Sequence, residues 1–304
     1  MNVFMAAVYT NRYMRGQRLY EDLNEREREI VHGLPHILES YHYVHKQTFV
    51  DEMRADNAKV FLDSGAFSAH TLGVELKVAD YCDYIKKNID IIRIEDGDLM
   101  ASVLDGIGDP LKTWRNQQEM EWRGVRPLPC FHFGEDERYL EWYIQNYSYI
   151  TIGGMVGKTV PTLTTWLDRI WSKYLLDKSG NPRIKVHAFG ITSVSIMERY
   201  PWYSCDSSSW VQMTAFGAIM SPTLGPLKVS EKSPSRHDMW QHVSNFSEIE
   251  KLQIHKMIED NGFSFERLST IYQSRAAWNL YAFGEINKKI NSTPNKTIPT
   301  MELF

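Results

Sequence analysis

Short apolar runs alternate with longer amphipathic segments along most of the 304-residue chain, and this alternation constrains the fold more than any other feature. It is typical of repeated βα units, in which helices connect parallel strands. The segment 109–124 also carries helix-boundary signals, with Asp109 as N-cap, Pro110 in the first position and Gly124 at the end. The predicted strands span residues 3–8, 59–63, 99–105, 126–133, 149–155, 183–190 and 202–206.

This number of strands favours a TIM (β/α)8 barrel over a doubly wound sheet, because no predicted strand is followed by the G-x-G-x-x-G turn of dinucleotide-binding folds. A Pro- and Ser-rich stretch at 221–240 predicts an irregular insertion, and two C-terminal helices are expected after it. We expect one domain over residues 1–290, followed by a frayed tail at 291–304.

Composition narrows the function classes. With 43% hydrophobic and 24% charged residues, the chain is of the globular type. It has neither an apolar run of about 18 residues nor a signal peptide, so we expect a soluble cytoplasmic protein without a membrane partner. The cysteines Cys82, Cys130 and Cys205 are too widely spaced for a disulfide framework or for a zinc cluster of close cysteines. The net charge of -4 gives no sign of a generally basic surface, so any site that binds a polyanion such as nucleic acid must be a local patch.

In a barrel, the active site is built at the C-terminal ends of the strands. Three acids are predicted there, and acids gathered in one pocket raise one another's pKa, so they indicate either chemistry or a bound cation. We disfavour a divalent metal, because no His-x-His or paired-acid spacing accompanies these acids. The candidate residues are Asp63, Asp105, His132, Gly153, Gly154 and Asp206.

Four motifs near these strand ends resemble motifs of the tRNA-guanine transglycosylase family. FLDSGAFS (61–68) is similar to its D-S-G-G-[FY] motif, and IGGMVG (152–157) to its base-binding I-G-G-L loop. HAFG (187–190) and SCDSSSW (204–210) are similar to its H-x-x-G strand and to its later Asp-bearing strand. The motifs follow the family's order, although Ala66 replaces the second glycine and the family's zinc motif of three close cysteines and a histidine is missing.

The resemblance implies a pentosyltransferase that exchanges guanine in a polynucleotide for a 7-deazaguanine base such as preQ0. The family includes phage and bacterial members that act on DNA. Because the chain ends soon after the predicted barrel and lacks a zinc subdomain, we expect DNA as the polynucleotide, with tRNA as the alternative. We expect no metal and no cofactor, and the sequence is compatible with a homodimer or a partner protein.

The resemblance also implies two catalytic carboxylates. Asp206 matches the family's nucleophile, which holds C1′ in a covalent intermediate while the bases exchange. Asp63 fits the second role, in which an acid protonates the leaving guanine and then deprotonates the incoming base. The structural alternative for Asp63 is a side chain that caps backbone N–H groups in a turn.

The remaining residues would bind the base. Phe67 offers a ring for stacking, and Asp105 would accept the N1–H and amine protons of guanine. The Gly153–Gly154 pair would present backbone N–H groups to the base carbonyl. Each also has a purely structural interpretation. Phe67 could pack in the core, Asp105 could be a solvated loop acid, and the two glycines could simply end a strand. The other predicted members of the binding set are Ser64, His132 and Met155, the last two with core packing as the alternative.

Two other function classes stay open. An N-glycoside hydrolase would use the same acids with water as the acceptor, and a non-catalytic barrel would only bind nucleic acid or a partner. Basic residues proposed to meet phosphates are Arg12, Arg15, Arg18, Lys228, Lys232, Arg236, Lys288 and Lys289.

Overall fold

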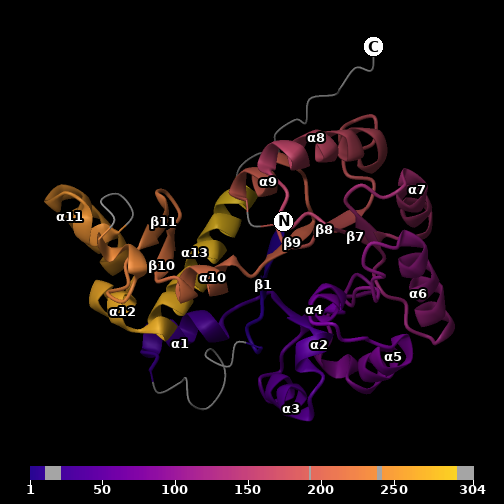
Figure 1. The fold of residues 1–304 in the computed structure, drawn as a ribbon, viewed down its shortest axis with the longest axis horizontal. Coiled ribbons are helices and arrows are strands. Elements are labelled where there is room, and N and C mark those ends of the chain that lie inside the picture. The colour runs from indigo at the N-terminus through magenta and orange to yellow at the C-terminus, as the bar shows by residue number, and fades with distance from the viewer. Residues whose placement is uncertain (11–21, 192, 238–241, 293–304) are drawn as a thin grey trace. The chain divides into compact units, whose positions relative to one another are not determined.

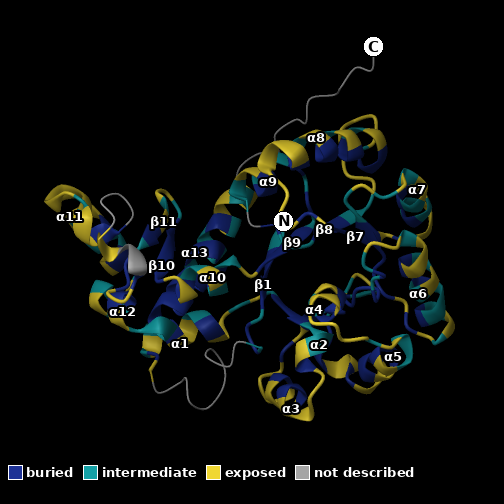
Figure 2. Ribbon diagram, in the orientation of Figure 1, coloured by how far each residue is buried: buried dark blue, intermediate teal, exposed yellow. Residues whose placement is uncertain are grey.

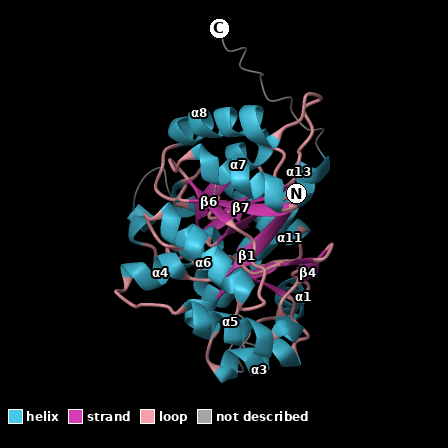
Figure 3. Ribbon diagram, turned by 90° about the vertical axis from the view of Figure 1, so that its right-hand side faces the viewer, coloured by secondary structure: helices cyan, strands magenta, loops and turns pink. Residues whose placement is uncertain are grey.

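The computed structural model describes residues 1–10, 22–191, 193–237 and 242–292, and its central element is a parallel sheet of seven strands (Figure 1). The strand order is β3-β2-β1-β9-β8-β7-β6, and all neighbouring strands are parallel. The sheet is strongly curled and flanked by helices, so the fold is TIM-like, but the strands do not close into a barrel (Figure 3). The strands are β1 (Asn2–Ala6), β2 (Ile37–Ser40), β3 (Val60–Asp63), β6 (Cys130–His132), β7 (Tyr149–Gly153), β8 (Lys185–Ala188) and β9 (Ser204–Ser207).

The predicted closed barrel is corrected at the segment 99–105. In place of a full strand, Ala101 forms an isolated parallel bridge with Leu62, and Ser102 forms one with Leu128. Backbone hydrogen bonds support both bridges, including Ser102 N to Leu62 O at 2.9 Å and Leu128 N to Ala101 O at 2.8 Å. Because each side makes a single bridge, the pairing is too short to form an eighth strand.

The chain divides into two compact units, and the sheet belongs to the first, which comprises residues 1–6 and 36–207 with the C-terminal end from Ile290. The predicted start of the helix at 109–124 is confirmed, because the Asp109 side chain caps Lys112 N and Pro110 begins α6. The other short elements are the hairpin β4 (Ile94–Glu95)–β5 (Asp98–Leu99), η1 (Ile89–Ile91) and a π-helical turn η2 (Trp171–Leu175). The helices are α2 (Tyr41–Val44), α3 (Gln47–Ala55), α4 (Ala66–Thr71), α5 (Val78–Lys87), α6 (Pro110–Trp122), α7 (Glu137–Asn146), α8 (Val160–Ile170) and α9 (Val194–Arg199).

Large apolar side chains fill the interior of the curled sheet, and its strands are largely buried (Figure 2). One core cluster takes side chains from β1, β2, β3 and β7 and from the bridged segments between β3 and β6. Close packing of this kind fixes the relative heights of the strands, and therefore the positions of their ends. The cluster consists of Phe4, Ala6, Leu38, Phe61, Met100, Leu128 and Tyr149.

The second unit comprises residues 7–35 and 208–289. Part of the stretch predicted as irregular is ordered, because β11 pairs antiparallel with β10 after a turn that ends at Gly225, whose φ is +76°. Within the described residues 242–292, three α-helices stand where two were predicted. The elements are α1 (Glu25–His32), α10 (Ser209–Ala215), β10 (Ala218–Ser221), β11 (Gly225–Lys228), η3 (Pro234–His237), η4 (Val243–Asn245), α11 (Glu248–Asp260), α12 (Phe265–Thr270) and α13 (Tyr272–Ser292).

The predictions of a C-terminal tail, of a single domain and of a chain without a membrane span can be compared with the structure in turn. The tail predicted from residue 291 begins inside α13, and residues 293–304 lie outside the described part of the chain. The single domain over 1–290 stays a prediction, because the division into two compact units does not decide whether either unit folds alone. Within the described ranges, no helix combines the length and the apolar character needed to cross a bilayer.

Candidate active site

The predicted site residues lie at one edge of the curled sheet, because parallel strands end there together. Asp63, His132 and Gly153 are the last residues of β3, β6 and β7. Asp206 is the residue before the end of β9, and Asp105 follows the bridged segment between β3 and β6. The fold therefore gathers three carboxylates that are far apart in sequence.

Asp63 is held by donors from three segments. Its Oδ2 accepts hydrogen bonds from Ser40 Oγ at 2.8 Å and from the Gly65 amide at 2.9 Å, and its Oδ1 accepts one from Ser102 Oγ at 3.2 Å. The Gly65 contact is the turn foreseen as the structural alternative. Burial raises the pKa of Asp63 to about 6; the hydrogen bond from Ser40 opposes this rise, and the charges of the other two acids add to it. A carboxyl group with such a pKa can both donate and accept a proton near neutral pH.

Asp206 lies beside a buried histidine that is held by hydrogen bonds on its other side. Its Oδ1 accepts the Gly190 amide at 2.8 Å and lies 3.4 Å from His187 Nε2. On the other side of that ring, Nδ1 is 2.6 Å from Ser204 Oγ, which is itself 2.6 Å from the Tyr149 hydroxyl. Burial lowers the pKa of His187, although Asp206 opposes the effect, so the ring is neutral at neutral pH. If the Ser204 hydroxyl donates to Nδ1, the ring carries its proton on Nε2 and directs it toward Asp206.

Three residues near the two catalytic candidates, His187, Ser40 and Ser102, are not among the site residues predicted from the sequence. His187 was interpreted as a structural residue, although its place in the HAFG motif, within the predicted strand 183–190, was a signal for it. Ser40 and Ser102 gave no signal, because β2 was not predicted and a single serine after an apolar run is common. The two serines hold Asp63 in place by hydrogen bonds, and His187 lies 3.4 Å from Asp206.

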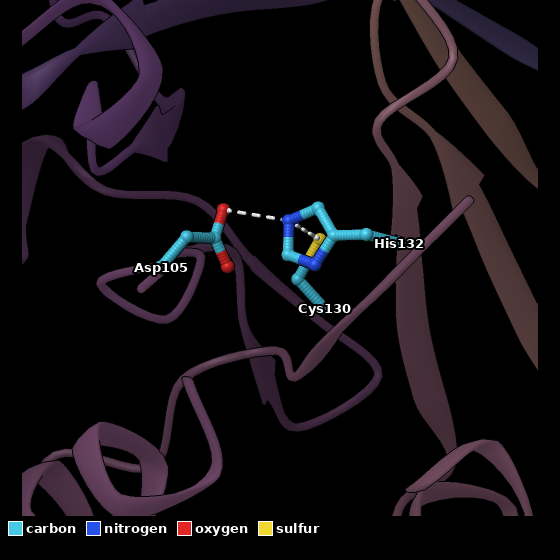
Figure 4. A group of neighbouring side chains, drawn as sticks. All are labelled: Asp105, Cys130 and His132. Atoms are coloured by element: carbon cyan, nitrogen blue, oxygen red, sulfur yellow. Dashed lines mark hydrogen bonds and ion pairs between the residues drawn. The ribbon is translucent and has the colours of Figure 1, made fainter. Parts of the chain in front are cut away.

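Asp105, Cys130 and His132 form a compact cluster (Figure 4). His132 Nε2 lies 3.4 Å from Asp105 Oδ2 and 3.5 Å from Cys130 Sγ. His132 Nδ1 lies 2.9 Å from one Glu135 oxygen, and the other Glu135 oxygen accepts the His132 amide at 3.0 Å. Burial acts to lower the pKa of His132, but the Cys130 sulfur and the Asp105 carboxylate raise it above its usual value. Asp105 Oδ1 is buried and has no hydrogen-bond partner within the described residues.

The other predicted base-binding residues differ in how far they are buried. Phe67 is 64% exposed on α4, which rules out the core alternative for its ring. Met155 is 2% exposed, as its core alternative requires. Ser64 is fully buried, and its amide donates to Ser102 Oγ at 2.9 Å. Gly154 has a φ of +71°, a conformation that favours glycine. A role in base binding stays a prediction for each of them.

A cavity of about 800 Å³ adjoins this edge, with Asp105 and Ala66 in its wall. Its volume lies in the range of ligand-binding pockets. Charged side chains of both signs line it, so it suits a polar ligand better than an apolar one. The ionisable residues that line it, besides Asp105, are His70, Glu75, Lys77, Asp109, Lys112 and Glu119.

The basic residues predicted to meet phosphates belong to the second unit or fall outside the description. Lys228 ends β11, Arg236 lies in η3, and Lys288 and Lys289 lie in α13. Lys232 lies between β11 and η3, while Arg12, Arg15 and Arg18 are outside the described residues. Their role in polynucleotide binding stays a prediction.

Comparison of the sequence with models of known protein families and with curated protein sequences finds no match.

Proposed function

We propose that the chain is a guanine transglycosylase that exchanges guanine in a polynucleotide, DNA in the first instance, for a 7-deazaguanine base. The observation that carries this proposal is the set of three acids at one sheet edge, each in a different setting. Asp63 has a pKa raised to about 6 by burial, Asp206 accepts a backbone amide, and Asp105 keeps one buried oxygen without a partner. Base exchange needs one acid to carry a proton, one to act as nucleophile and one to bind the base. Acids in different environments can fill these different roles.

In the first step, Asp206 attacks C1′ of the target nucleotide. The C1′–N9 bond breaks, its electron pair leaves with guanine, and protonated Asp63 gives that base a proton. The product is a glycosyl ester between C1′ and Asp206, as in retaining glycosidases. The Gly190 amide positions the attacking carboxylate by donating to its Oδ1 at 2.8 Å, and His187 Nε2 lies 3.4 Å from the same oxygen.

In the second step, the incoming 7-deazaguanine loses its N9 proton to Asp63, which is now ionised. N9 attacks C1′, the ester bond to Asp206 breaks, and the carboxylate is regenerated. Protons and electron pairs therefore balance over one cycle, and no redox partner is required.

The base would be read by Asp105. Its Oδ1 has no partner, and a buried acceptor in that state favours a ligand that donates a hydrogen bond. Guanine and its 7-deaza analogues offer two adjacent donors, N1–H and the exocyclic amine. The exposed Phe67 ring on α4 is a suitable stacking surface for the flat base.

Three finer points belong to the same proposal. The bridges of Ala101 and Ser102 to the edges of the sheet support an eight-segment, TIM-type ring in which 100–103 takes the place of the missing strand. The motif resemblance supports DNA, since the family includes members that act on DNA. A base in a duplex must be flipped out before Asp206 can reach C1′. We further propose that the protein acts in the cytoplasm.

The test is incorporation of radiolabelled guanine into duplex DNA and, in parallel, into unmodified tRNA at low salt. The wild-type chain should label DNA. Asp206→Asn should abolish labelling, and Asp63→Asn should slow it by roughly 100-fold or more, as expected for loss of a general acid. Asp83→Asn, on the exposed face of α5, is the matched control and should label at the wild-type rate.

Each alternative gives a different result. Label in tRNA alone would replace DNA by tRNA and keep the chemistry. Loss of guanine without incorporation would identify a hydrolase. Near-wild-type exchange by Asp206→Asn would overturn the mechanism.

A further inference from the structure

We propose that Asp105, Cys130 and His132 bind a zinc ion. This inference goes beyond base exchange and does not rest on it. The sequence analysis expected no metal, because it considered the spacing between cysteines and between acids. The fold instead brings one ligand of each type together, from the first and last residues of β6 and from the segment that follows the bridges.

The distances between the candidate ligand atoms fit a metal. His132 Nε2 lies 3.4 Å from Asp105 Oδ2 and 3.5 Å from Cys130 Sγ, and the three ligand atoms lie within 4.8 Å of one another. Zinc bonds of about 2.0–2.3 Å at tetrahedral angles separate neighbouring ligand atoms by about 3.3–3.7 Å. Both distances from Nε2 fall in this range.

A direct hydrogen bond between His132 and Asp105 explains the geometry less well. A charged N–H donor and a carboxylate oxygen approach to about 2.7–2.9 Å, which is shorter than the observed 3.4 Å. The other carboxylate oxygen, Asp105 Oδ1, has no partner although it is buried. A zinc ion between the two side chains would bind the carboxylate directly, whereas the imidazole ring of His132 faces it only across 3.4 Å.

Glu135 supplies the outer contact that metal-bound histidines usually have. Its carboxylate can only accept, so the His132 Nδ1 atom at 2.9 Å carries a proton and donates it. Its second oxygen accepts the His132 amide at 3.0 Å, which fixes the carboxylate in place. With Nδ1 donating to Glu135, Nε2 is the ring nitrogen that faces Asp105 and Cys130, and it would bind the ion by releasing its proton to solvent, as in carboxylate–histidine–zinc arrangements.

The neighbouring strand leaves room for the ion. Gly153 ends β7 beside the cluster, and a Cβ atom at this position would lie 3.2 Å from Cys130 Sγ and 3.4 Å from His132 Nε2. A side chain there would crowd the two ligand atoms. The glycine is therefore suited to a metal site as well as to the predicted backbone contact with the base.

Three protein ligands of the nitrogen, oxygen and sulfur type select zinc over calcium or magnesium, which prefer oxygen ligands. They leave a fourth position for water or a ligand atom, as in catalytic zinc sites. Asp105 also lines the cavity of about 800 Å³, so a small molecule can reach the neighbourhood of the ion. Asp105 would bind the ion through Oδ2 and keep Oδ1 for another donor.

The experiment is a titration of the full chain with Co²⁺ after removal of bound metal by a chelator, followed by competition with Zn²⁺. Wild-type protein should bind one Co²⁺, with a sulfur-to-cobalt charge-transfer band and the intense visible bands of four-coordinate cobalt. Zinc should displace the cobalt. Because no substrate is used, the outcome is independent of the proposed transglycosylase activity.

Cys130→Ser should abolish the charge-transfer band and weaken binding at least 100-fold. Glu135→Gln keeps all three ligands and should weaken binding by about 10- to 100-fold. Cys82→Ser, a buried cysteine in α5, is the matched control and should leave spectrum and affinity unchanged. Thermal melting confirms that each variant is folded. A folded wild-type protein that binds neither ion, or a cobalt spectrum that Cys130→Ser leaves intact, would overturn the proposal.

Discussion

At Asp63, three hydrogen-bond donors meet a carboxyl group that is largely removed from water. The donors stabilise the ionised form, whereas burial and the two nearby acids destabilise it, and burial prevails because the pKa rises to about 6. With a pKa near 6, the carboxyl group of Asp63 can gain or lose a proton near neutral pH. Each donor comes from a different segment, so the balance depends on the register of β2, β3 and the bridged segment.

Asp63→Asn tests this environment without any substrate. The folded-state pKa of about 6 lies above the ordinary value of 3.8, so the folded state keeps its proton to higher pH than the unfolded state. The contribution of the wild-type residue is therefore fully present below pH 3.8 and is lost as pH rises through 6. Relative to the wild type, the variant should gain about 2–3 kcal/mol in free energy of unfolding between pH 4 and pH 7.

Urea denaturation at several pH values measures this difference. Asp83→Asn replaces an exposed acid on α5, so its free energy of unfolding should change with pH in the same way as that of the wild type. A difference between Asp63→Asn and wild type that stays constant with pH would show that the carboxyl group titrates normally.

Much of the strand-end site could be predicted from the sequence, because Asp63, His132, Gly153 and Asp206 each follow an apolar run directly. Sequence order does not give the register between strands. For that reason the contact of His132 with Asp105, and the approach of His187 to Asp206, could not be predicted.

At the scale of elements, the errors have local physical causes. β2 has four residues and is followed at once by the helix α2, so no apolar run long enough to indicate a strand is visible there. The segment 99–105 is apolar enough to predict a strand, but its pairing is limited to one bridge on each side. The helix α6 was predicted well, because its N-cap and first-position proline act locally.

The helix α1 is tied to α12 and α13 by one buried carboxylate, and this gives a prediction for the second unit. Glu27 is fully buried and accepts from Arg267 at 2.9 Å and 2.7 Å and from Ser274 Oγ at 2.6 Å. Arg267→Met keeps an apolar stem but leaves the acid without its cation. We expect a loss of about 3 kcal/mol or more in free energy of unfolding.

The matched control is Arg138→Met. Arg138 is an exposed arginine whose ion pair with Asp136 has the same 2.7 Å separation. Solvent screens this pair, so the control should lose much less stability than Arg267→Met. Adding Glu27→Gln to Arg267→Met should recover part of the lost stability, because it removes the buried charge. Equal losses in the two single variants, measured by chemical denaturation, would contradict the assignment.

At the scale of the whole molecule, the net charge of -4 sets a condition on any polynucleotide partner. Phosphate contacts usually dominate the affinity of nucleic-acid-binding proteins, and they weaken steeply with salt. The acids of the candidate site lie in the first unit and the candidate phosphate-binding lysines in the second. Binding of DNA should therefore be modest and strongly dependent on salt, which is why the assays above use low salt.

The central claim is that Asp206 forms a covalent bond to the sugar of the target nucleotide. The most direct measurement is mass spectrometry of the full chain after incubation with duplex DNA, acid quenching and digestion. The account predicts a peptide in which Asp206 carries a deoxyribose fragment, and its absence in Asp206→Asn. Exchange of labelled guanine without such an adduct, or an adduct on another residue, would contradict it.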